Sequence, residues 1–220
     1  MIQPPLRQPD PTPSQQAAIA KVAAAIARAG GVALLCGPQG VGTSTVLSIL
    51  AAGERNRGRS VECRDLAGWL TGSPWAGDLP DIVLADGAHR AADGDLARLL
   101  ASCRHRASPA CLVLAGEGRL LTLVARDSAV EGAVHLRASL RPLGPDESRM
   151  IVGPRLAAAG VDPASAERVA ATIHEIGGGI PAAMLRLADL AAVVASSRHD
   201  RVIEPGDVEM IHRRLSPLAA

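Results

Sequence analysis

Short apolar runs alternate with segments of helical spacing along the first two thirds of the chain. Ser14 opens a helical pattern that ends at Gly30-Gly31, and a continuous apolar run follows at once. Apolar runs of this length are typical of strands buried on both faces of a sheet. Such runs, or shorter strand-like segments, recur at 31–36, 60–66, 81–86, 110–116 and 133–140. Strands that alternate with helices predict a parallel α/β sheet sandwiched by helices.

The pattern changes after residue 142, where only helical spacing remains. Glycine-rich or polar turns separate four expected helices, at 145–159, 163–176, 181–196 and 205–214. The change predicts an α/β domain over 14–142 and a small all-helical lid domain over 143–220. Residues 1–13 hold five prolines and predict a flexible or extended leader.

Composition excludes several classes of protein. Hydrophobic residues make up 48% of the chain and charged residues 20%, so the apolar-poor, charge-rich signature of disorder is absent. The chain has no Phe, no Tyr and two Trp, and so it lacks the aromatic platforms on which single-stranded nucleic acids stack. A net charge of +1 argues against a protein held to nucleic acid by bulk charge.

The cysteines and the N-terminus point to a cytoplasmic protein. None of the four cysteines lies in a Cys-x-x-Cys pair, so we expect reduced thiols and no metal site built from cysteine. The N-terminal residues lack the apolar core of a signal peptide, and no uncharged apolar run reaches about 18 residues. We therefore expect no membrane insertion.

The first candidate site lies where the run 31–36 meets the helical pattern after it. GPQGVGTS, at 37–44, matches the phosphate-binding loop G-x-x-x-x-G-K-[ST] at every position except one. Its glycines allow backbone N–H groups to face a phosphate, and the helix N-terminus adds its dipole. Ser44 stands where the hydroxyl ligand for Mg²⁺ belongs, whereas Thr43 replaces the lysine. The candidate nucleotide-binding residues are Gly37, Pro38, Gln39, Gly40, Val41, Gly42, Thr43, Ser44 and Thr45.

The second candidate site ends the apolar run 81–86. Asp86 fits the acid that holds Mg²⁺ through water, together with Ser44. The next residue in such sites is usually a glutamate that polarises the attacking water, and here it is Gly87. The expected cofactor is ATP or ADP with Mg²⁺, bound weakly, and the alternative is a pocket that binds no nucleotide.

Five segments, taken in order, carry a resemblance to a known family. DIVLADGAHR is similar to a family strand that ends in D-E-A-H, and CLVLAGEGRL to one that ends in Gly-Gln-Pro-Glu-Leu. Three further segments have counterparts in the family. Residues 140–161 are similar to its entry into the lid, 176–195 to a helix that starts with G-G-x-P-R, and 201–211 to its final helix. Together these segments resemble the AAA+ ATPases of the general secretion pathway A (ExeA/GspA-like) type. The resemblance implies the AAA+ fold, a nucleotide pocket between the two domains and work near the inner membrane.

The chain departs from this family at its catalytic positions. The loop lysine is Thr43, and the water-polarising glutamate is Gly87. The arginine of G-G-x-P-R, which senses the γ-phosphate from the lid, is Ala182. A Gln-Arg pair of the family, expected nine residues before Pro142, falls on Ala133. We therefore expect a pseudo-ATPase that has no catalytic residue.

Magnitudes separate binding from hydrolysis. A hydrogen bond to a charged group contributes about 1.5–3 kcal/mol, so loss of the lysine weakens nucleotide binding roughly 10–150-fold. A positioned base contributes about 10²–10⁴ in rate, and an arginine finger about 10³–10⁵. Binding therefore survives at millimolar nucleotide, while turnover falls to near background.

Three other side chains are weighed as substitutes, and for each the structural role is favoured. Lys21, the only lysine, lies on the helix before the first strand and has no reason to point at the loop. Arg186 lies one helical turn after Ala182 and is a candidate phosphate contact from the lid, with a solvated or ion-paired arginine as the alternative. His89 follows the Asp86 strand, where a lone histidine is more often a structural group.

Surface features suggest partners. Trp69 and Trp75 flank a Gly/Ser/Pro loop and are candidates for binding a protein partner, with packing under the loop as the alternative. Two short runs, at 53–60 and 104–106, hold several arginines that could contact DNA phosphates. The runs are short and nearby acids offset their charge, so we expect solvated loops there.

Three functions follow from these observations. The first is a non-catalytic AAA+ scaffold or regulatory subunit that binds a protein partner, such as an active AAA+ relative. The second is a weak ATPase, or one half of a composite site in a hetero-oligomer. The third is a DNA-associated accessory factor of replication or transposition type, which contacts DNA through lid arginines.

Overall fold

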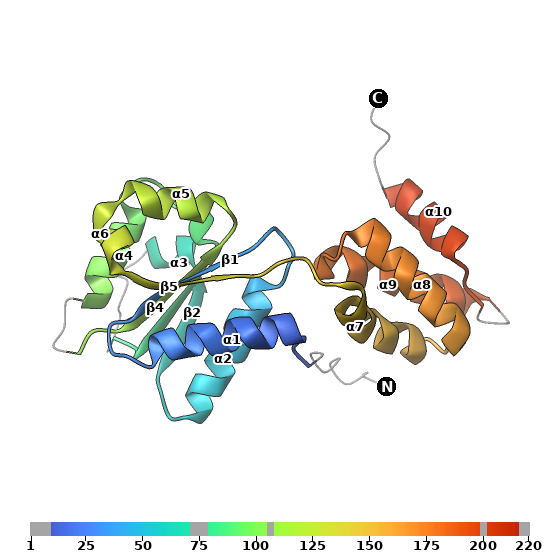
Figure 1. The fold of residues 1–220 in the computed structure, drawn as a ribbon, viewed down its shortest axis with the longest axis horizontal. Coiled ribbons are helices and arrows are strands. Elements are labelled where there is room, and N and C mark those ends of the chain that lie inside the picture. Colours follow the sequence, from blue (N-terminus) through green and yellow to red (C-terminus); the bar gives the residue numbers. More distant parts are fainter. Residues whose placement is uncertain (1–9, 71–78, 105–107, 199–201, 216–220) are drawn as a thin grey trace. The chain divides into compact units, whose positions relative to one another are not determined.

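The computed structural model describes residues 10–70, 79–104, 108–198 and 202–215. The chain forms two compact units that divide between Arg141 and Pro142. The first is an α/β unit and the second is helical (Figure 1). The predicted fold class is confirmed.

Five parallel strands form the sheet of the first unit, in the order β2-β3-β4-β1-β5. Their bounds are β1 Val32–Cys36, β2 Val61–Asp65, β3 Ile82–Asp86, β4 Cys111–Gly116 and β5 Val134–Ser139. The three inner strands are buried almost throughout, whereas the edge strands β2 and β5 have exposed positions. Continuous apolar runs therefore mark the inner strands, and each predicted strand is present but shorter by one or two residues.

Helices cover both faces of this sheet (Figure 1). Ala33 and Leu35 of β1 pack in one core with helices α1 (Pro13–Ile26) and α2 (Thr43–Asn56). Leu34, on the opposite face, packs in a second core. That core includes residues of α3 Leu66–Leu70, α4 Asp95–Arg104, α5 Arg119–Arg126 and α6 Ser128–Ala133, and of the short 3₁₀ helix η1 Ala88–Arg90. Side chains that alternate along β1 thus contribute to the hydrophobic core on each face of the sheet.

The second unit consists of α7 Pro145–Ala158, α8 Pro163–Gly177, α9 Pro181–Ser197 and α10 Pro205–Leu215. Each helix begins at a proline, whose fixed φ suits the first turn. Leu156, Ile173 and Met184 are fully buried in its core. Gly179 has a φ of 70°, and its carbonyl accepts a 2.8 Å hydrogen bond from the N–H of Leu143. None of the helices in the described parts of the chain has the length and apolar character needed to span a membrane.

Candidate functional site

The glycine-rich loop connects β1 to α2, as the sequence predicts. Gly40 and Gly42 have φ values of 77° and 106°, in the left-handed region that glycine adopts without strain. The first hydrogen bond of α2 runs from Val46 N to the Gly42 carbonyl, 3.0 Å away. The N–H groups that precede Val46 therefore lie in the first turn of α2, where backbone N–H groups have no intrahelical acceptor. Such a turn is suited to binding an anion.

Close packing fixes the shape of this loop. A Cβ on Gly37 would lie 2.6 Å from Val41 Cγ1 and 3.0 Å from the Leu140 carbonyl oxygen, so only glycine fits there. Val41 is buried beneath the loop. A Cβ on Gly42 would lie 2.9 Å from Nε2 of Gln15, which is buried on α1. The cradle is therefore set by its contacts within the α/β unit.

The two expected Mg²⁺-associated residues are brought together. The Ser44 hydroxyl donates a 2.5 Å hydrogen bond to Asp86 Oδ2, although the residues lie 42 positions apart. The N–H of Gly87 donates to the other carboxylate oxygen, Oδ1, at 2.8 Å. Hydroxyl and carboxylate oxygens are the kind of ligand that Mg²⁺ prefers. Thr43, the first residue of α2, brings no positive charge to this place.

Gly87, which follows Asp86, has close neighbours and a positive φ. Its φ is 65°, which disfavours every other residue type, and a Cβ there would lie 2.7 Å from Asp65 Oδ2. Asp65 ends β2 and is the register partner of Asp86 on β3. Its carboxylate is 3.2 Å from Arg90 Nη1. The space next to Asp86 is thus occupied by an acid from the neighbouring strand, and that acid is paired with a cation.

Sequence reasoning missed Asp65 and Arg90. The signal was present, because the strands at 60–66 and 81–86 each reach an acid close to their carboxyl end. Parallel strands in one sheet place those ends at the same edge. The adjacency of β2 and β3, however, becomes visible only in the folded sheet.

A side chain also fills the space beside a glycine at the end of β4. A Cβ on Gly116 would lie 2.8 Å from Nδ1 of His89, so the imidazole fills that space. His89 Nε2 is 3.5 Å from Glu117 Oε1, and the His89 carbonyl accepts a 2.7 Å hydrogen bond from Arg119. Nδ1 is buried and has no hydrogen-bond partner among the described residues. His89 is therefore packed against the end of β4 beside the site.

The other positions compared with the family lie away from the loop in sequence. Ala133 ends α6 and is buried in the core of the α/β unit. Ala182 lies in the first turn of α9, and both it and Arg186, one turn later, are exposed. Lys21 is exposed on α1.

Of the two tryptophans predicted to bind a partner, the structure describes Trp69. Trp69 is only 2% exposed and packs in the core, with the Arg64 guanidinium carbon 4.8 Å from its ring centroid. The packing alternative therefore holds for Trp69, and the residue is not displayed to a partner. Trp75 lies outside the described residues.

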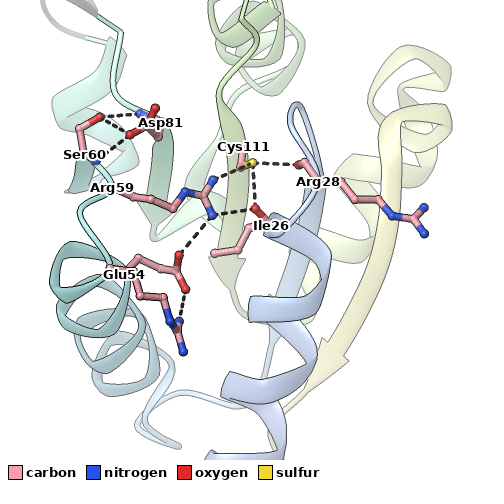
Figure 2. A network of polar contacts seen from close by, with 8 residues as sticks. Ile26, Arg28, Glu54, Arg59, Ser60, Asp81 and Cys111 are labelled. Carbon is pink, nitrogen blue, oxygen red and sulfur yellow. Dashed lines mark hydrogen bonds and ion pairs between the residues drawn. The ribbon is translucent and has the colours of Figure 1, made fainter.

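The arginine run 53–60 has a structural role at the opposite edge of the sheet, where the strands begin. Glu54 is buried and pairs with Arg59 at 3.2 Å (Figure 2). Arg59 also donates to the carbonyl of Ile26 at 2.9 Å and to the thiol sulfur of Cys111 at 3.5 Å. These contacts join α2 to α1 and β4, and they use the arginine charge internally.

Ion pairs also engage most of the arginines in the described part of the helical unit. Acids on the same unit pair with Arg149, Arg155, Arg168, Arg198 and Arg213. A DNA phosphate must compete with those acids for each arginine. The distribution of charge therefore gives the DNA-binding hypothesis little support.

No protein-family model and no curated protein matches the sequence. Solved structures do match. RuvB of Thermotoga maritima superimposes with a TM-score of 0.65 at 18% identity, over 91% of this chain and 69% of that one. ORC2 of Aeropyrum pernix gives 0.66 at 15%, over 99% and 72%, and Hsp104 gives 0.69 at 15%, over 94% and 43%. All three are AAA+ P-loop ATPases. The chain has the AAA+ fold.

The AAA+ fold places the loop, Ser44 and Asp86 at the carboxyl edge of the sheet, where open α/β sheets bind ligands. The residues fit a Mg²⁺-bound nucleotide in part. The left-handed glycines and the start of α2 suit phosphate, and the linked Ser44 and Asp86 oxygens suit Mg²⁺. The cationic side chain of the loop is the part that is missing. At identities of 15–18%, the likeness establishes the fold, and the resemblance to the secretion-type branch stays a prediction.

Proposed function

We propose that this AAA+ protein binds nucleotide weakly, does not hydrolyse it, and serves a protein partner as a non-catalytic scaffold or regulatory subunit. The observation that carries the proposal is the surroundings of Gly87. A glutamate there would need a left-handed backbone and would overlap the Asp65 carboxylate. The positive φ and this close contact support a proposal in which no water-polarising glutamate acts at position 87.

Asp65 is a poor replacement for that group. Its Oδ2 is 3.2 Å from Arg90 Nη1, and its Oδ1 accepts a 3.0 Å hydrogen bond from the N–H of Ala67. Both carboxylate oxygens of Asp65 are thus already engaged, so neither is free to orient an attacking water. Loss of a positioned base lowers the rate about 10²–10⁴-fold. Thr43 and Ala182 remove two more cationic groups, so turnover near background follows.

Weak nucleotide binding is supported by the cradle that remains. Backbone N–H groups at the start of α2 would hold phosphate oxygens, and Ser44 with Asp86 would hold the Mg²⁺ that shields them. The ORC2 structure contains ADPNP and ADP, and the Hsp104 structure contains ATPγS. A missing charged hydrogen bond costs about 1.5–3 kcal/mol, which leaves binding in reach of millimolar nucleotide.

The partner is a protein, and an active AAA+ relative is the first candidate. A subunit that signals its nucleotide state to other subunits needs the fold and the phosphate cradle, but it does not need to hydrolyse ATP. The resemblance to secretion-type ATPases supports a cytoplasmic protein that a partner recruits to the inner membrane.

One observation favours a second function, a weak ATPase or one half of a composite site. The Ser44–Asp86 hydrogen bond keeps the Mg²⁺-associated pair assembled. A neighbouring AAA+ subunit would then supply the missing cation. Weak turnover that appears only when an AAA+ partner is added supports this alternative.

Turnover measurements separate the two functions. Phosphate release from millimolar MgATP is measured for the wild-type chain and for Asp86→Ala, prepared in the same way. We expect the two rates to be equal, because neither protein hydrolyses ATP. Turnover of ordinary AAA+ speed that disappears in Asp86→Ala would overturn the proposal.

A further inference from the structure

A hollow of about 310 Å³ lies between the end of α1 and the start of the edge strand β5. Its walls are small or apolar, with Ala24, Ala25, Gly31 and Leu136 among them, and its polar side chains are those of Arg28 and His135. No acid is among the described residues that line it. The hollow therefore combines an apolar surface with basic side chains.

The guanidinium of Arg28 is available to an anion. Arg28 is exposed just after α1, and none of the described acids pairs with it. Figure 2 shows its side chain directed toward β5 and away from the Arg59 network. At the negative end of α1, the Ile26 carbonyl accepts a 2.9 Å hydrogen bond from Arg59, and the Arg28 carbonyl accepts one of 3.0 Å from Gly31 N–H. These bonds satisfy carbonyls that would otherwise repel an anion.

His135 supplies a second donor to the hollow. The pairing of β1 with β5 shifts register here, and His135 is the extra residue of the bulge. Its Nδ1 accepts a hydrogen bond from Val32 N–H at 3.4 Å, so Nε2 carries the proton of the neutral ring and is a donor. A guanidinium and an imidazole N–H are donors that bind a carboxylate. The hollow therefore suits an acidic group, and its apolar walls suit the carbon atoms attached to that group.

The strand beside the hollow has one edge without a partner strand. Among the described residues, β1 is the only strand that pairs with β5. Leu140 N–H donates to the Cys36 carbonyl at 2.8 Å, and the groups that face a neighbouring strand alternate along the chain. Arg137 and Ser139 therefore direct their backbone N–H and C=O groups away from β1, and both residues are exposed. An extended peptide is the ligand that pairs with such an edge.

We propose that the outer edge of β5 and the hollow beside it bind an extended acidic segment of a partner protein. A carboxylate of that segment lies between Arg28 and His135. Charge complementarity supports this choice, because Lys21 is also exposed on α1 without an acid partner in the described part of the chain. The inference rests on the proposed function in that the chain serves a protein partner, and it does not require bound nucleotide.

An NMR titration of the full chain with a synthetic peptide tests the docking surface. The probe is a short acetylated peptide of alternating threonine and valine that ends in a glutamate amide, and its twin ends in a glutamine amide. We expect amide shifts at 135–139 and around Arg28, and about tenfold tighter binding of the glutamate peptide. Shifts centred on the glycine loop, equal affinities of the two peptides or absence of binding at millimolar peptide would overturn the proposal.

Arg28→Gln identifies the carboxylate contact, with Arg126→Gln as the matched control. Arg126 is also exposed at the end of a helix, and its helix α5 packs on the opposite face of the sheet. We expect Arg28→Gln to weaken binding of the glutamate peptide about tenfold and that of the glutamine peptide less than about twofold. Arg126→Gln should change neither affinity. An equal loss for both peptides in Arg28→Gln would contradict the contact.

A third peptide keeps the test decisive if Arg28→Gln folds poorly, which its melting curve would reveal. Methylation of alternate backbone amides of the glutamate peptide should abolish binding, because it blocks pairing with β5. Unchanged affinity of the methylated peptides, whichever alternate set is methylated, would contradict that pairing. Calorimetry with MgADP on the same protein separates the two proposals. Heat from MgADP without peptide binding refutes the docking surface and leaves nucleotide binding standing, whereas peptide binding without that heat does the reverse.

Discussion

Replacement of Gly87 by alanine tests whether the fold has adapted to a glycine beside Asp86. The residue has a φ of 65°, and the left-handed conformation costs a non-glycine residue about 1–2 kcal/mol. The new Cβ would also lie 2.7 Å from Asp65 Oδ2 and would displace that carboxylate from Arg90. The pair is largely exposed, so its loss adds at most about 1 kcal/mol. We expect a total loss of about 1–3 kcal/mol in the free energy of unfolding.

Two glycines provide matched controls in urea denaturation of the full chain. Gly58 has a φ of 80° and no atom within 4 Å of an added Cβ, so Gly58→Ala reports the backbone cost alone. Gly53 lies within α2 with open space around it, and Gly53→Ala should stabilise the protein by about 0.5–1 kcal/mol. Gly87→Ala should therefore be the least stable of the three.

The result that refutes this reasoning is a Gly87→Ala protein as stable as the wild type. Position 87 would then accept a side chain, and the missing glutamate would be a simple loss that one substitution restores. Gly87→Glu offers the stronger form of the test. It should cost at least as much stability as the alanine and should produce no ATP turnover.

Three further predictions concern groups outside the candidate site. Burial raises the pKa of Cys103 to about 12, whereas Cys63 is exposed with a pKa raised less. Alkylation at pH 8 followed by mass spectrometry should label Cys63 first and Cys103 only on unfolding, and equal rates would contradict the burial. Hydrogen bonds from Arg198 lower the pKa of Asp207 in the folded state, so this stabilisation is present above about pH 4 and is lost as the pH falls through the folded pKa. Asp207→Asn should cost about 1 kcal/mol at pH 7 and almost nothing near pH 2, as acid and urea titrations will show. Gly179→Ala should destabilise the helical unit by about 3 kcal/mol, because its Cβ would lie 2.3 Å from a backbone oxygen, and no loss in urea unfolding would argue against that packing.

Local patterns predicted the parts of this fold that depend on neighbours in the sequence. The run 31–36 is apolar throughout because β1 lies between two other strands and under two layers of helices. The glycine loop is recognisable because its turn requires positive φ at fixed spacing. The start of each lid helix at a proline has the same local origin. These features need no knowledge of which strands become neighbours.

The features that sequence reasoning missed depend on the order of strands in the sheet and on how deeply a side chain is buried. Asp65 reaches Gly87 only because β2 pairs with β3, and that pairing brings in Arg90 as well. Trp69 belongs to a five-residue helix whose burial follows from the sheet beneath it. The arginine run 53–60 resembles a solvated loop in sequence, yet Arg59 reaches the buried Glu54 and Cys111 in the folded chain.

Calorimetric titration with MgADP, followed by a turnover assay with MgATP on the same sample, tests the central claim most directly. The account predicts heat from binding at millimolar nucleotide and no phosphate release above that of Asp86→Ala. Phosphate release at the rate of an ordinary AAA+ ATPase, abolished by Asp86→Ala, would contradict the account and show that the chain hydrolyses ATP despite Thr43 and Gly87.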